Sequence, residues 1–140
     1  MLIQRKILSA CVMTMLVCAC SSTPVPASKA APTPSERLSG LQTPPPGEFA
    51  TLVVTRDEGF YGSACDTVLS VDGKEVGRLK SGEVARFYAK PGAIILGAQT
   101  SAMCLGGLKE REVRLPPAST VRYRISIDSS GGLDLSPTAF

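Results

Sequence analysis

Cysteine is the most reactive residue type in this sequence, and its chemistry is limited by the absence of histidine. The chain has five cysteines, at positions 11, 18, 20, 65 and 104, and no histidine. It therefore lacks the usual general base at neutral pH and the commonest nitrogen ligand for metals. A Ser-His-Asp triad, a Cys-His pair and a histidine-bound zinc water are all excluded.

Carboxylates are the remaining groups that could perform acid–base catalysis. Asp57, Glu58 and Asp66 lie in one loop region, where no periodicity forces their side chains together. We interpret them as solvated loop charges. The sequence predicts a protein that is not an enzyme and that needs no cofactor or metal.

The first 19 residues have the pattern of an export signal. Arg5 and Lys6 precede an uncharged, mostly apolar run of 13 residues, from 7 to 19. As a helix this run would rise only about 20 Å, which is too short to span a bilayer core of about 30 Å. A cleaved signal is therefore favoured over a permanent membrane span.

The end of this run, together with the cysteine after it, resembles a lipobox, the cleavage site of bacterial lipoproteins. Val17 is aliphatic, Cys18 and Ala19 are small, and Cys20 comes next. Cys20 would receive the lipid, because choosing Cys18 would place Leu16 and Val17 where small residues are needed. Two or more acyl chains anchor a protein stably. The alternative is an ordinary secretory signal with a coincidental cysteine.

The same resemblance predicts the compartment. Ser21 follows the lipidated cysteine, whereas an aspartate there would favour retention in the inner membrane. In a Gram-negative cell this favours the outer membrane facing the periplasm. Cleavage and lipidation leave Cys65 and Cys104, and an even pair in an oxidising compartment predicts a disulfide. Two reactive thiols or a soft-metal pair are the alternative.

Composition divides the rest of the chain into a tether, 20–47, and a domain, 48–140. The stretch 21–47 contains seven of the 11 prolines, few large apolar residues and no aromatic residue, so we expect a disordered tether. After cleavage 13 basic and 12 acidic residues remain, a net charge of about +1. Without a basic patch, a nucleic-acid partner is not expected.

The domain has the pattern of a small β-protein. Residues 120–128 alternate strictly, with Val121, Tyr123, Ile125 and Ile127 on one face. Asp72-Gly73 is a strong hairpin signal, and a second hairpin is expected at Lys90-Pro91-Gly92. We predict an all-β, antiparallel sandwich of immunoglobulin-like or transthyretin-like kind. Its predicted strands are 49–56, 67–71, 74–79, 83–89, 93–99, 108–115 (an edge strand) and 120–128.

Residues 56–96 resemble the bacterial lipoproteins grouped as domain of unknown function 2846. The shared pattern comprises a Gly-aromatic-Gly-Ser loop at 59–63, a Val-Asp-Gly-Lys hairpin at 71–74, a Gly-x-Leu segment at 77–79, an aromatic strand with Phe87 and Tyr88, and the Pro91-Gly92 turn. That family commonly has a histidine in the strand after this turn, whereas this chain has Ala93, Ile94 and Ile95. The resemblance implies a β fold and an envelope location, and it carries over no catalytic residue.

Phe60 and Tyr61 form the candidate partner-binding site. They are adjacent aromatic residues flanked by Gly59 and Gly62, so both cannot point inward if the segment is extended. The alternative is a loop with both rings packed. We expect a lipid-anchored, non-enzymatic module that binds or assembles with another envelope protein. An enzyme or carrier acting on envelope glycans or lipids is the other hypothesis.

Overall fold

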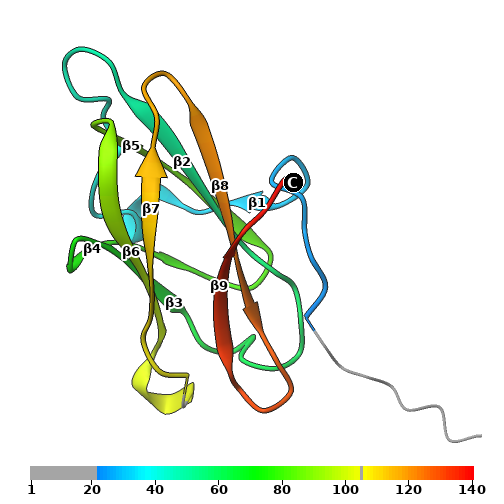
Figure 1. The fold of residues 1–140 in the computed structure, drawn as a ribbon. Coiled ribbons are helices and arrows are strands. Elements are labelled where there is room, and N and C mark those ends of the chain that lie inside the picture. Colours follow the sequence, from blue (N-terminus) through cyan, green and yellow to red (C-terminus); the bar gives the residue numbers. More distant parts are fainter. Residues whose placement is uncertain (1–21, 105) are drawn as a thin grey trace, which may run out of the picture.

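The computed structural model describes residues 22–104 and 106–140, which form a β-sandwich (Figure 1). Regular structure in the described residues consists of nine strands and two short 3-10 helices, η1 (Ser35–Arg37) and η2 (Ala102–Cys104). The predicted all-β sandwich is therefore confirmed.

One layer is a five-stranded sheet with the order β1-β5-β2-β8-β9. Its strands are β1 (Ala31–Pro32), β5 (Glu83–Ala89), β2 (Ala50–Arg56), β8 (Thr120–Ile127) and β9 (Leu133–Pro137). β2 is antiparallel to β5 but parallel to β8, and β1 is parallel to β5. The sheets are thus mainly, but not wholly, antiparallel.

The other layer is a four-stranded sheet with the order β4-β3-β6-β7. Its strands are β4 (Lys74–Leu79), β3 (Thr67–Val71), β6 (Gly92–Thr100) and β7 (Lys109–Leu115). β7 pairs with β6 alone and forms the predicted edge. Its charged side chains discourage pairing with a foreign strand.

The core lies between the sheets and follows the alternation of the strands. In β8, Tyr123, Ile125 and Ile127 are buried, as the period-two pattern predicts. The inward residues of β2 include Leu52 and Val54, which are fully buried in the same apolar cluster as Phe87 of β5 and Leu69 of β3. Burial of such side chains is the main force that holds the layers together.

Two turns expected to form hairpins have different roles. Asp72 and Gly73 both have positive φ and join β3 to β4 in the predicted two-residue hairpin. The hairpin expected at Lys90-Pro91-Gly92 is absent from the described structure, because β5 and β6 belong to different sheets. This turn instead carries the chain from one layer to the other. Before the turn, β5 pairs with β2 in the five-stranded sheet, and after it β6 pairs with β3 in the four-stranded sheet.

The described part of the predicted tether, 22–47, differs from the disorder that we expected. β1 pairs with the free edge of β5, and Thr33 is buried. Further along, Leu38 and Leu41 pack against the core. We call this segment the N-terminal strap. Its few apolar side chains and its backbone hydrogen bonds suffice to hold it, because the sheet offers an open edge where extended, proline-rich chain can lie.

Candidate functional site at the apolar end of the sandwich

The loop between β2 and β3 exposes the two predicted aromatic residues. Phe60 is 84% exposed and Tyr61 is 41% exposed. Their rings meet edge to face, with centroids 5.8 Å apart, a favourable arrangement for an aromatic pair. The loop is therefore not packed with both rings inward, and a large apolar surface faces solvent.

Arg56 fixes this loop to the core. It occupies an inward position at the end of β2 and is 2% exposed. Its guanidinium donates hydrogen bonds to the backbone carbonyls of Gly62, Cys65 and Leu79, the last at 2.9 Å. Burial lowers the pKa of Arg56, but arginine remains charged in proteins. The buried cation thus holds the second half of the aromatic loop against the end of β4.

Sequence reasoning missed Arg56, although a signal was present. Ala50, Leu52, Val54 and Arg56 share one face of β2, and that face points into the core. A charged residue at the last inward position of a strand indicates that backbone acceptors are gathered there. Which carbonyls they are depends on tertiary structure.

The disulfide supplies a second constraint. Cys65 and Cys104 are bonded, with their Cα atoms 6.3 Å apart, so the predicted pairing is confirmed. The bond ties the aromatic loop to η2. η2 carries Met103, which is 93% exposed. Exposed apolar groups from two distant parts of the chain are thereby held at one end of the sandwich.

A cavity of about 240 Å³ lies between these segments. Tyr61 and Met103 border it, together with Ile127 of β8 and the turn 129–131. Gly62 is needed beside Ile127 because its φ is +68° and an added Cβ would approach Ile127 Cδ1 at 2.9 Å. We call the exposed side chains of Phe60, Tyr61 and Met103, with this cavity, the apolar end.

The three carboxylates of this loop region have different environments. Asp57 is buried, Glu58 is exposed and Asp66 is partly buried. Asp57 Oδ2 lies 3.1 Å from Arg124 Nη2, although neither carboxylate oxygen makes a hydrogen bond of standard geometry. Burial raises the pKa of Asp57, and the attraction of Arg124 only partly opposes it. An ion pair at the sheet surface accounts for this residue.

The N-terminal strap begins beside the aromatic loop. Backbone hydrogen bonds join Thr23 and Glu58, and a Cβ on Gly59 would lie 3.1 Å from Ser22 Cα. The described chain therefore starts next to Phe60. Cys20, the predicted lipidation site, lies outside the described residues.

No protein-family model matches this chain, and no curated protein sequence matches it. Over residues 22–104 and 106–140, no helix is long and apolar enough to span a bilayer. The same residues contain no cluster of three or more Cys, Asp or Glu side chains arranged to hold a metal ion.

Proposed function

We propose that this protein is a lipid-anchored, non-enzymatic binding module of the bacterial envelope, which holds a partner envelope protein at its apolar end. The observation that carries the proposal is the exposure of Phe60, Tyr61 and Met103 on segments that are fixed in place. Aromatic residues and methionine are enriched at protein interfaces, where aromatic residues often contribute most of the binding energy.

Rigidity supports a binding role for this surface. Arg56 bonds the loop to three backbone carbonyls, and the disulfide bonds it to η2. A surface that is already ordered loses little conformational entropy when it binds. Exposed apolar groups are costly to keep in solution, so a second surface that covers them would stabilise the protein.

The position of the strap supports a binding site that lies close to the membrane. Cys20 is three residues before Thr23, and consecutive Cα atoms are about 3.8 Å apart, so a lipid on Cys20 would attach within about 11 Å of Thr23. Thr23 pairs with Glu58, close to Phe60. A partner bound at the apolar end would therefore contact the protein near the bilayer surface. A long disordered tether would instead have allowed this contact far from the membrane.

The envelope location rests on the signal, on Ser21 and on the resemblance of residues 56–96. The signal and the resemblance support a lipid-anchored protein of the cell envelope, and in a Gram-negative cell Ser21 favours the outer membrane facing the periplasm over the inner membrane. The alternative function, an enzyme or carrier acting on envelope glycans or lipids, has less support. It requires convergent carboxylates, and Asp57 is buried against Arg124.

Replacement of Cys20 tests the anchor. Cys20→Ala should abolish incorporation of labelled palmitate and release the protein from the membrane fraction, whereas Cys18→Ala should keep both properties. Continued acylation of the Cys20→Ala variant, or loss of acylation in Cys18→Ala alone, would contradict the assignment.

A crosslinked pull-down from native membranes tests the binding surface. The double variant Phe60→Ser, Tyr61→Ser should fold and be acylated normally but recover much less of a specific envelope protein than the wild type does. Ile95→Ser is the control, because Ile95 is an exposed apolar residue on β6, away from the apolar end. Equal recovery by the double variant would contradict the proposal. So would a wild type that recovers no partner while the purified protein turns over envelope material.

A further inference from the structure

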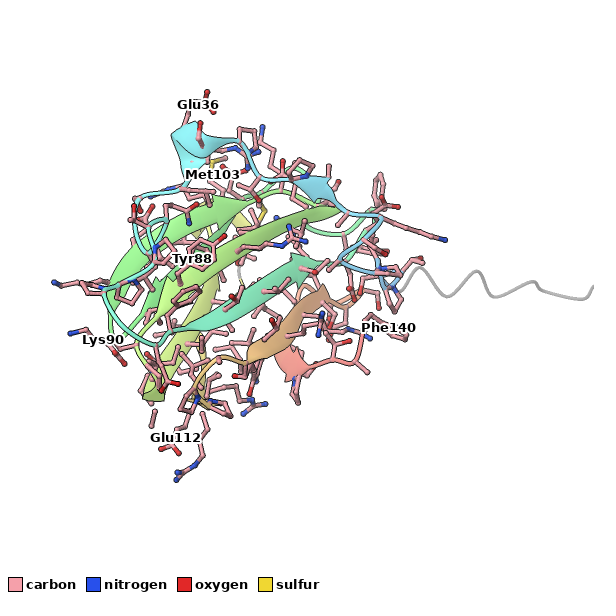
Figure 2. The ribbon with its side chains drawn as sticks, turned by 90° about the horizontal axis from the view of Figure 1, so that it is seen from above. Glu36, Tyr88, Lys90, Met103, Glu112 and Phe140 are labelled. Atoms are coloured by element: carbon pink, nitrogen blue, oxygen red, sulfur yellow. A yellow bond between two sulfur atoms is a disulfide. The ribbon has the colours of Figure 1, made fainter. Side chains whose placement is uncertain are left out.

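A second cavity, of about 500 Å³, lies on the outer face of the five-stranded sheet. Its floor is formed by β2, β5 and β8. Ala27 and Ser28 of the N-terminal strap border it, together with Ala139 and Phe140 near the C-terminus. Figure 1 shows these two chain segments side by side next to β1 and β8, and Figure 2 shows Phe140 well apart from Met103. We call this cavity the outer cleft; it is distinct from the apolar end.

Strand register places two arginines on the same face of the sheet in this cleft. Val53 of β2 pairs with Arg86 of β5 on one side and with Arg122 of β8 on the other. Because Leu52 and Val54 point into the core, Val53 and its two partners point outward. Two strand spacings separate the arginine Cα atoms by about 10 Å, a gap that two arginine side chains can close around one small ligand.

Among the residues that the structure describes, neither guanidinium group has a carboxylate partner. Arg86 and Arg122 are exposed, and neither forms an ion pair with any described residue. The other arginines of residues 22–140 are engaged: Arg56 with backbone carbonyls, and Arg37, Arg78, Arg111, Arg114 and Arg124 with carboxylates. Two unpaired positive charges in one cleft repel each other, and an anion between them would remove that repulsion.

Hydroxyl groups complete the lining. Thr51 and Thr120 are register partners on the same outward face, and Ser28 borders the cleft from the strap. A carboxylate offers two oxygens, which one guanidinium can satisfy. Two guanidinium groups and three hydroxyls instead match the larger number of acceptors on a tetrahedral oxyanion.

We propose that the outer cleft binds a phosphate group, held between Arg86 and Arg122 with hydroxyl donors from Ser28, Thr51 and Thr120. Arginine binds phosphate with paired, charge-assisted hydrogen bonds. Free phosphate and a phospholipid headgroup share this chemistry. The lipid source depends on the proposed anchor at Cys20, whereas binding of free phosphate does not.

The test uses the mature lipoprotein in neutral detergent, with binding followed through the NMR signals of the arginine Nε–H groups. One titration uses inorganic phosphate and a second uses short-chain phosphatidylglycerol. We expect saturable binding in at least one titration, with affinity reduced about tenfold or more by Arg86→Gln or Arg122→Gln. Saturation by phosphatidylglycerol alone would assign a headgroup site, and saturation by phosphate alone would assign a free-anion site.

Arg114→Gln is the matched control, because Arg114 is an exposed arginine on β7 of the other sheet. Its affinity should equal that of the wild type. The proposal is overturned if neither ligand saturates the protein, or if Arg114→Gln weakens binding as much as the two cleft variants do. Because Arg86 and Arg122 are exposed, both Gln variants should unfold at the wild-type temperature, and that measurement separates loss of binding from loss of folding.

Discussion

Thr23 and Glu58 bind each other through their backbones in both directions. The Thr23 N–H donates to the Glu58 carbonyl at 2.6 Å, and the Glu58 N–H donates to the Thr23 carbonyl at 3.0 Å. This short pairing fixes the start of the strap beside the loop that exposes Phe60. It joins two features that lie more than 30 residues apart in the sequence, the chain leading from the predicted anchor and the candidate binding surface.

Loss of the disulfide should destabilise the whole domain. The bond between Cys65 and Cys104 closes a loop with a sequence separation of 39, for which the chain-entropy model gives about 4 kcal/mol. The double variant Cys65→Ser, Cys104→Ser should lose roughly this much in the free energy of unfolding, measured by urea denaturation. Reductant should lower the stability of the wild type but not that of the variant. A loss below about 1 kcal/mol would show that the loop is already constrained without the bond.

Replacing Arg56 should loosen the aromatic loop and lower stability together. In Arg56→Met the carbonyls of Gly62, Cys65 and Leu79 lose their hydrogen-bond donor. Because these hydrogen bonds involve a charged group, we expect the free energy of unfolding to fall by an amount on the order of 3 kcal/mol. Backbone hydrogen exchange should rise most at residues 62–65. The control Arg114→Met, on exposed β7, should change stability by less than about 0.5 kcal/mol. If both variants behave alike, Arg56 does not hold the loop.

The buried carboxyl of Asp57 should make stability depend on pH. Because burial raises the folded-state pKa of Asp57 above its unfolded value, folding favours the protonated form. The resulting stabilisation is present at pH values below the unfolded pKa of about 4, and it is lost as pH rises through the folded pKa. Asp57→Asn keeps the group neutral, so the variant should gain stability relative to the wild type between pH 4 and pH 7.

Urea denaturation at pH 4, 5 and 7 measures this difference. Glu58→Gln is the matched control, because it removes the exposed neighbouring carboxylate. A gap between Asp57→Asn and the wild type that stays constant with pH, or that closes as pH rises, would contradict the predicted direction.

Much of the strand pattern could be predicted from local sequence. The strands 67–71, 74–79 and 83–89 agree with the structure to the residue, because alternation and turn residues mark both of their ends. β9 was missed, since its two buried leucines, Leu133 and Leu135, give only one repeat of the period-two pattern. The Pro91 turn was assigned to a hairpin because a turn residue does not reveal which sheet receives the next strand.

The site was harder to predict than the strands. The disulfide followed from the count of cysteines, whereas the residue types of the aromatic loop left both an exposed and a packed arrangement open. The ordered strap could not be predicted. Composition reports the apolar content of a segment, but it does not show that the edge of β5 is open for the segment to pair with. The roles of Arg56 and Met103 depend on partners brought together from β4, η2 and the aromatic loop, and no local pattern specifies these contacts.

Photocrosslinking in intact cells tests the central claim, that the apolar end holds a partner envelope protein. A photoreactive residue would replace Phe60 in one variant and Glu112 in another, because Glu112 projects from β7 on the side opposite Met103 (Figure 2). We predict that position 60 yields one discrete protein adduct in the membrane fraction and that position 112 does not. If position 60 crosslinks only to lipid, or if both positions give the same adducts, the claim is contradicted.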